Sequence, residues 1–286
     1  MADASVDGVA SPTPSVPLDA LSEWGFTGRL FPSGDITHTV FEKGAGKPVL
    51  VMHELPGLAM PAVNFGLRLS DAGFNVHLPH LFGEILKHDT RGNYRKLCIS
   101  REFGRLQAGV SSPITMWLRA LVDEIAARTG RERIGAIGMC LTGAFAIPLV
   151  LNPRVRAAIA AEPAIPFSLS YEIAGIGRGE WMRQLNVSDA ELAQSAQRAK
   201  SDSVPMLGMR FRADRLCPAE RLARMHEAYG EQLQVEEYSF PSRVREIFDP
   251  PHAVLTEEYD KAPDAPAAHP AKQAFSLVVD FLNRHL

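Results

Sequence analysis

Short apolar runs alternate with amphipathic segments along most of the chain. The predicted strands cover residues 49–53, 74–78, 134–139, 155–161, 204–211 and 233–238, and the run 49–53 is continuously apolar, as in a strand buried on both faces. Residues 35–41 instead alternate apolar and polar positions, as a half-buried antiparallel strand does. Because strands and helices follow one another, the pattern predicts an α/β protein with a mainly parallel central sheet covered by helices on both faces.

The segments between these runs predict the covering helices. A helix over residues 61–72 is ended by Gly73, and apolar residues recur at helical spacing over 112–129, where Gly130 ends the pattern. The last helix packs through Ala274, Leu277, Val278, Phe281 and Leu282. Residues 168–203 form an insertion that is either a lid or a surface excursion.

The ends and the composition limit the class of protein. Residues 1–23 are rich in Ala, Ser, Pro and Asp and predict a disordered leader before a single domain over 24–286. No apolar run approaches the ~20 residues that cross a bilayer. The net charge of −3 leaves no broad basic surface for nucleic acid or membrane. We therefore expect a cytoplasmic protein. Its oligomeric state is not predicted.

One of the three cysteines is a candidate reactive residue. The three cysteines, Cys98, Cys140 and Cys217, are widely spaced and form no CxxC pair of the kind found in zinc sites. Cys98 and Cys217 lie at no strand-to-helix junction, so we interpret both as structural. Cys140 follows the buried strand 134–139 directly.

Residues 138–143 read Gly-Met-Cys-Leu-Thr-Gly and join that strand to a helix predicted over 141–151. A nucleophile between small residues at such a turn is the nucleophile-elbow pattern, here with cysteine in the usual serine position. Residues two positions away must be small because the turn is tight. Gly138 meets this requirement and Thr142 departs from it. We predict that Cys140 is a nucleophile, and a buried core thiol is the alternative.

A thiol is mostly protonated at neutral pH, so it needs a base, and in this pattern the acid and then the histidine follow the nucleophile. Asp214 comes just after the strand 204–211, at the sheet edge where the acid belongs. Helix capping is its alternative role, and Asp249 is a second candidate acid. Only His252 lies in the loop after the last strand. The other histidines after Asp214 are less suitably placed: His226, His269 and His285.

Two backbone N–H groups must receive the developing oxyanion. One comes from the residue after the nucleophile and one from the loop after an early strand, which makes Leu141 and Leu55 the candidates. The same early turn, 53–57, carries Glu54. A carboxylate there would lie near Cys140 and could hold or accept its proton, although an exposed loop acid is the alternative.

These residues resemble the dienelactone hydrolase family, whose members share an H/Q-E-x-x-G turn, a G-x-C-x-G-G elbow and a later Asp and His. The matches form an ordered series over roughly residues 35 to 286: the turn 53–57, the elbow 138–143, Asp214 and His252. The resemblance implies an α/β-hydrolase fold and a Cys140–His252–Asp214 triad that cleaves an ester or lactone through a thioester. It also implies that Glu54 contacts the resting thiol until an anionic substrate displaces it.

Departures from the family pattern bear on the substrate. Thr142 stands where the elbow has its first glycine, and Ala-Val-Leu-Thr follows His252, where dienelactone-cleaving members carry a substrate-binding arginine. Arg101 is the candidate for the family's other arginine, with Arg210 and Arg212 as competitors and a surface salt bridge as the alternative role. The insertion would also reshape the pocket.

Other functions remain open at this point. A carboxylesterase or thioesterase could use the same triad on a larger, neutral acyl compound. A non-catalytic protein of this fold could use Cys140 to sense oxidants or contact a ligand. A zinc hydrolase fits less well, because no second histidine follows His53 and Glu54 at the spacing that a zinc helix needs. We therefore expect a small-molecule ester or lactone substrate, no metal and no cofactor.

Overall fold

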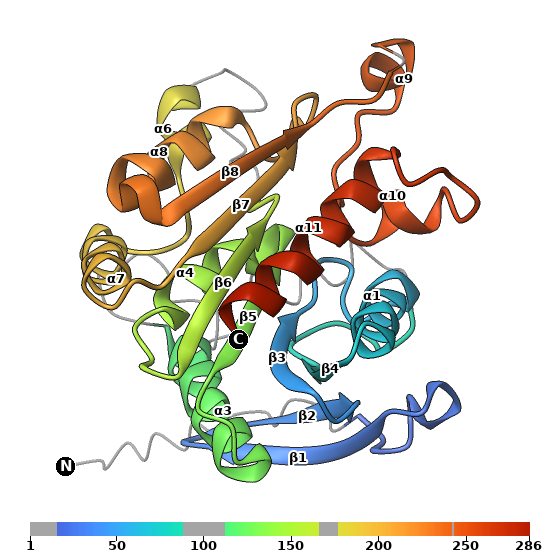
Figure 1. Cartoon of the computed structure of the whole chain (residues 1–286), viewed down its shortest axis with the longest axis vertical. Helices are drawn as coiled ribbons and strands as arrows, with labels where there is room; N and C mark the ends of the chain where they lie inside the picture. Colours follow the sequence, from blue (N-terminus) through green and yellow to red (C-terminus); the bar gives the residue numbers. More distant parts are fainter. Residues whose placement is uncertain (1–15, 88–111, 166–176, 242) are drawn as a thin grey trace, which may run out of the picture.

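The structure is a computed structural model that describes residues 16–87, 112–165, 177–241 and 243–286. Within them lies an eight-stranded sheet with strand order β1-β2-β4-β3-β5-β6-β7-β8 (Figure 1). β3 to β8 run parallel, and β1 and β2 are antiparallel additions at one edge. The strands are β1 Thr27–Ser33, β2 Ile36–Lys43, β3 Lys47–Met52, β4 Phe74–Pro79, β5 Ile134–Met139, β6 Val155–Ala161, β7 Met206–Phe211 and β8 Leu233–Tyr238.

Helices cover both faces of the sheet. Side chains of α3, α4, α7 and α8 fill one apolar core, and those of α1 and α11 fill the other. Figure 1 shows how these helices are arranged around the sheet. The described helices are α1 Met60–Asp71, α3 Pro113–Thr129, α4 Ala146–Leu149, α6 Arg178–Arg183, α7 Asp189–Ser201, α8 Ala219–Tyr229, α9 Arg243–Phe248, α10 Glu257–Asp260 and α11 Pro270–His285, with short 3₁₀ turns η1 Ser22–Trp24, η2 Cys140–Phe145 and η3 Gly230–Gln232. None of them is long and apolar enough to cross a membrane.

The predicted α/β architecture with a mainly parallel sheet is confirmed. The predicted strands 134–139, 155–161 and 233–238 coincide with β5, β6 and β8. β5 and β6 lie in the middle of the sheet, and nearly every residue in them is buried. A strand buried on both faces is apolar throughout, which makes it easy to recognise in a sequence.

The continuous helix predicted over residues 141–151 is wrong. The chain forms the 3₁₀ turn η2 from Cys140 and then only four α-helical residues in α4. Pro148 explains the short length, because it has no N–H to donate to the Ala144 carbonyl four residues earlier. Without a long helix behind Cys140, little helix dipole is available to stabilise a thiolate.

The amino-terminal part is more ordered than the leader expected over residues 1–23. From residue 16 on the chain packs against the domain, since Leu21 is fully buried and the Val16 carbonyl accepts a hydrogen bond from Thr39 Oγ1. β1 had no counterpart among the predicted strands. It is an edge strand without a fully buried residue, and it contains Pro32, so its sequence lacks the usual apolar run.

Of the insertion predicted over residues 168–203, residues 168–176 lie outside the described residues. The remainder contains α6 and α7. α7 packs its Leu192 and Ala196 into the core, and its Arg198 donates hydrogen bonds to the carbonyls of Val150 and Asn152. The described part of the insertion is therefore a layer that covers the sheet, and a lid role remains a prediction for 168–176.

Candidate active site

The site is assembled at the carboxyl edge of the parallel strands. β3, β5, β6 and β7 are neighbours in the sheet, and the residues that follow them are Glu54, Cys140, Glu162 and Asp214. The long connection after β8 brings His252 back to the same edge, where its ring binds Asp214. Ligand and catalytic sites of open α/β sheets lie at this edge.

The elbow that carries Cys140 has the backbone that a nucleophile elbow needs. Cys140 has a φ of 52° and is 8% exposed. A Cβ on Gly138 would lie 2.1 Å from the Thr142 carbonyl oxygen, so only glycine fits there. Thr142 is tolerated because its hydroxyl accepts the Met139 N–H at 3.1 Å and reaches the Met52 carbonyl at 3.0 Å. The departure at Thr142 thus ties the elbow to the end of β3.

Asp214 and His252 form a close pair. The carboxylate Oδ2 of Asp214 accepts a hydrogen bond from His252 Nδ1 at 2.7 Å. Its Oδ1 accepts the backbone N–H groups of Leu216 at 2.8 Å and Cys217 at 3.1 Å, so the carboxylate is fixed from both sides. This arrangement places the proton of the neutral imidazole on Nδ1 and leaves the Nε2 lone pair for another group.

Cys140 also influences the pKa of the His252 imidazole. Burial lowers the pKa of His252, but the charges of Asp214 and Cys140 and hydrogen bonding to them outweigh burial, so that the pKa stands well above 6.5. Nε2 is buried and makes no hydrogen bond of regular geometry within the described part of the chain. The ring therefore interacts with the thiol and has an Nε2 that is free to exchange a proton with it.

Glu54 is buried at the end of β3 and is bound by the loop of residues 252–256, which we call the histidine loop. Thr256 Oγ1, four residues after His252, donates a hydrogen bond to Glu54 Oε1. Burial raises the pKa of Glu54 to about 7, although the Thr256 bond and the His252 charge oppose the rise. The carboxyl group is therefore close to half protonated at neutral pH. Its described hydrogen bond runs to Thr256 and not to the thiol of Cys140.

Glu162 is a member of this cluster that we did not predict from the sequence. It follows β6 directly, is fully buried, and accepts the Val254 N–H on Oε2 at 3.2 Å. Burial and the negative charges of Glu54 and Asp214 raise its pKa well above 4.5. The sequence offered only a weak signal for Glu162, an acid directly after a buried strand, as at Glu54.

The other predicted residues have mixed outcomes. Leu141 follows Cys140, and Leu55 packs against the same apolar core, but no contact tests their N–H groups as an oxyanion hole. Arg101 and Cys98 lie outside the described residues. Asp249, the second candidate acid, is exposed on its loop. Burial raises the pKa of the Cys217 thiol to about 12, as expected for a structural cysteine.

The competing arginines have structural partners. Arg210 is buried and donates to Glu237 and to the Cys217 carbonyl, the latter at 2.7 Å. Arg212 is exposed and lies 3.6 Å from a Glu237 carboxylate oxygen. Arg210 thus shapes the loop after Asp214.

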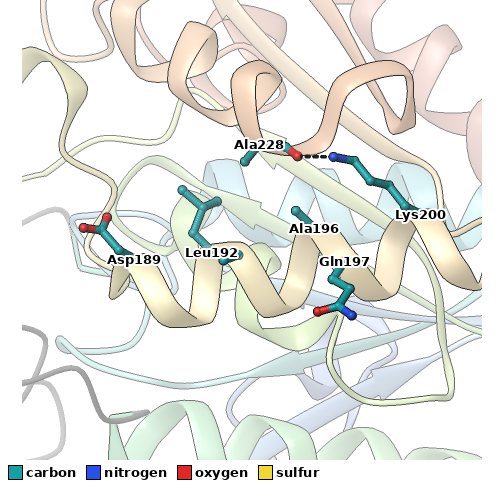
Figure 2. A pocket seen from close by; sticks show the side chains of 7 residues that line it. Asp189, Leu192, Ala196, Gln197, Lys200 and Ala228 are labelled. Carbon is teal, nitrogen blue, oxygen red and sulfur yellow. Dashed lines mark hydrogen bonds between the residues drawn. The ribbon is translucent and has the colours of Figure 1, made fainter.

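A shallow surface groove lies elsewhere, along α7 and the end of α8. Figure 2 shows its lining, where Lys200 Nζ donates to the Ala228 carbonyl at 2.7 Å. None of the predicted site residues lines this groove. Within the described ranges, no three His, Cys, Asp or Glu side chains are arranged to hold a metal ion.

Comparisons with known proteins address the family and the fold. The model of the dienelactone hydrolase family matches residues 37–286. No curated protein sequence matches the chain. A protein from Klebsiella pneumoniae subsp. pneumoniae assigned as a dienelactone hydrolase superposes with a TM-score of 0.61 at 15% identity, covering 91% of this chain and 98% of its own.

Two further solved structures share the fold. An esterase from Pyrococcus furiosus superposes with a TM-score of 0.58 at 15% identity, covering 96% of this chain and 99% of its own. A dienelactone hydrolase-like promiscuous phosphotriesterase from metagenomic libraries superposes with a TM-score of 0.59 at 16% identity, covering 91% of this chain and 98% of its own. At such low identity these likenesses show the fold alone. The family model, however, spans most of the sequence, and the chain therefore belongs to the dienelactone hydrolase family of enzymes.

Proposed function

We propose that this protein hydrolyses a carboxylic ester or lactone through a thioester on Cys140, with His252 as base and acid and Asp214 as its orienting partner. The observation that carries the proposal is the 2.7 Å hydrogen bond from His252 Nδ1 to Asp214. It fixes the tautomer whose Nε2 is available to a strained, buried cysteine at the elbow.

In the first half of the reaction, His252 Nε2 takes the proton of the Cys140 thiol, and Sγ attacks the carbonyl carbon. The carbonyl oxygen becomes an oxyanion, which the N–H groups of Leu141 and Leu55 would receive. As the tetrahedral intermediate collapses, the C–O bond to the leaving group breaks. The imidazolium returns its proton to the departing alkoxide, and a thioester remains.

In the second half, His252 takes a proton from water, and the resulting hydroxide attacks the thioester carbonyl. The C–S bond breaks, the thiolate leaves and is stabilised by the imidazolium, and a carboxylic acid is released. Glu54 fits the proton-holding role implied by the family resemblance, because a carboxyl group with a pKa of about 7 both gives and accepts a proton near neutrality.

The loop after His252 favours a neutral substrate. Residues 253–256, Ala-Val-Leu-Thr, are buried and pack inside the domain. They supply no cation at the place where an arginine would bind a substrate carboxylate. A neutral ester or thioester is therefore our preferred substrate class, and dienelactone itself is the second.

The test follows hydrolysis of a chromogenic acetate ester and of a cis-dienelactone by the parent, Cys140→Ala and His252→Ala proteins. His226→Ala is the matched control, because His226 is exposed on α8. We expect both active-site variants to lose kcat/KM by about 10⁴-fold or more and the control to keep it. Mass spectrometry after a rapid acid quench should find one acyl group on Cys140 of the parent.

Two results would count against the proposal. Activity that survives both active-site substitutions would remove the triad from the reaction. A parent protein that is inactive on every ester, thioester and lactone would favour a ligand-binding or oxidant-sensing role for Cys140.

A further inference from the structure

Glu162 occupies an unusual backbone position next to the triad. It follows β6 with a φ of 33°, in the region that residues other than glycine seldom adopt. Its N–H still donates to the Met209 carbonyl of the next strand at 2.7 Å. Strained positions of this kind persist where the surroundings fix them, and they concentrate at functional sites. The fold thus holds this carboxyl group in place although backbone sterics oppose it.

The side chain of Glu162 is directed at the loop that carries the catalytic histidine. Its Oε2 accepts the N–H of Val254, two residues after His252. Two residues further on, Thr256 donates its hydroxyl to Glu54. Two buried carboxyl groups, from the ends of β6 and β3, therefore hold one five-residue loop, and His252 is its first residue.

We propose that Glu162 is a positioning residue, which fixes the loop of residues 252–256 by accepting the Val254 N–H on its carboxyl group. The proposal rests on the function proposed above for Cys140 and His252. It adds a residue for which neither the sequence motifs nor the family resemblance assigns a role.

The surroundings favour the neutral form of the Glu162 carboxyl group. Burial and the charges of Glu54 and Asp214 disfavour its anion, while His252 and the Val254 bond favour the anion less strongly. The guanidinium of Arg221 donates to the carbonyls of Pro163 and Leu216 and makes no hydrogen bond to Glu162. Glu162 Oε1 is buried and without a hydrogen-bond partner in the described part of the chain.

A neutral carboxyl group suits the reaction better than an anion. Its carbonyl oxygen still accepts the Val254 N–H, so the loop is held. It adds no negative charge beside a carbonyl substrate that becomes an oxyanion when Cys140 attacks it. A carboxylate in this place would raise the energy of that oxyanion by like-charge repulsion.

The experiment compares three substitutions of Glu162 with one exposed control. Glu162→Gln keeps a carbonyl acceptor and is permanently neutral, whereas Glu162→Ala removes the acceptor and Glu162→Asp withdraws it by one methylene. Glu231→Gln makes the same chemical change at an exposed position. For each protein we would measure kcat and KM on the acetate ester, and the rate of Cys140 alkylation by iodoacetamide against pH, with Cys140→Ala as the background.

We expect Glu162→Ala and Glu162→Asp to lower kcat by about 100-fold with little change in KM, because the imidazole is displaced from the thiol. Glu162→Gln should restore kcat to within about threefold. Its alkylation midpoint should coincide with that of the parent, because replacing a neutral group by a neutral group leaves the field at His252 unchanged.

Three results would overturn the proposal. Glu162 acts as an anion if Glu162→Gln lowers kcat as much as Glu162→Ala does, or if Glu162→Gln shifts the alkylation midpoint downward by a pH unit. Glu162 has no positioning role if Glu162→Ala behaves like Glu231→Gln. Glu162→Asp replaces Glu162→Ala in these comparisons where the alanine variant does not fold.

Failure of the proposed function gives a different pattern. The parent would then hydrolyse none of the esters, while alkylation of Cys140 would still report on the imidazole beside it. In that case an alkylation profile of Glu162→Asp equal to that of the control would still reject the positioning role.

Discussion

His53 is fully buried and His252 is 20% exposed at the same carboxyl edge of the sheet, and their pKa values move in opposite directions. The pKa of His252 stands well above 6.5, whereas burial, together with the nearby His80, lowers that of His53 to about 3. His53 lies between backbone groups, accepting the Leu81 N–H at 3.0 Å on Nε2 and facing the Glu54 carbonyl at 3.1 Å through Nδ1. Burial alone therefore keeps an imidazole neutral, and a carboxylate partner such as Asp214 reverses the effect.

The comparison separates the histidine that we propose as the base from histidines of the core. His77 and His80 resemble His53, since burial lowers the pKa of each to about 4. They stay neutral throughout the physiological range and act as core residues. His252 is the one of these four with a hydrogen bond to a carboxylate as short as 2.7 Å. A close, hydrogen-bonded carboxylate sets His252 apart, since His77 keeps a lowered pKa although Glu42 lies 3.7 Å from its Nδ1.

The strongest way to break this difference is to remove the counter-charge. Asp214→Asn should lower kcat on an ester by about 10⁴-fold, because the imidazole loses both its tautomer and the anion that stabilises its cation. NMR titration of the ring should find the pKa of His252 near or below the ordinary value of about 6.5. An unchanged kcat with an unchanged titration would show that Asp214 does not set the state of His252.

The structural histidines should make the protein acid-sensitive. A pKa lowered in the folded state means that the unfolded chain binds more protons, so stability is lost as the pH falls from 6.5 through about 4. His77→Leu should remove about 3 kcal/mol of this loss between pH 7 and pH 4, as measured by urea unfolding. His226→Leu, at an exposed position, should leave it in place. Equal acid profiles for His77→Leu and the parent would contradict this account.

Glu54 should give a smaller effect of opposite sign. Its pKa is raised to about 7 in the folded state, so its contribution is fully present below pH 4.5 and is lost as the pH rises through 7. Glu54→Gln should remove about 2 kcal/mol of the decline between pH 5 and pH 7 in urea unfolding. Glu231→Gln is the control. A decline of the same size in Glu54→Gln would mean that another group causes it.

Thr256 should give the smallest effect. Thr256→Val removes the hydroxyl that donates to Glu54, and we expect a loss of about 1 kcal/mol in the free energy of unfolding at neutral pH. The pKa of Glu54 should rise above 7, because this bond favours the charged carboxylate. Thr27→Val, on the exposed edge strand β1, should change neither quantity. A pKa of Glu54 that does not rise would exclude Thr256 as its partner.

Features with a local sequence signal were predictable. The central strands are apolar on both faces, so their bounds follow from the apolar runs alone. The elbow around Cys140 follows from Gly138, where a Cβ would collide with backbone. Asp214 and His252 followed from their order after Cys140, and the structure brings the two side chains into contact.

Features that depend on contacts between distant segments were not predictable. Glu162 has its role through Val254, which is far away in the sequence, and an acid after a strand has many other uses. The length of the helix after Cys140 was overestimated. The apolar sequence of residues 141–151 is typical of a buried helix, but Pro148 interrupts the backbone hydrogen bonds of that helix. β1 was missed because an edge strand needs neither an apolar face nor an uninterrupted ladder.

The histidine loop also constrains how the gene can change. Within residues 252–256 it supplies the imidazole, the Val254 N–H for Glu162 and the Thr256 hydroxyl for Glu54. An inserted or deleted codon would move at least two of these groups out of register at once. Length variation should therefore be absent from this loop in functional variants of a mutagenesis library, even at positions where single replacements survive.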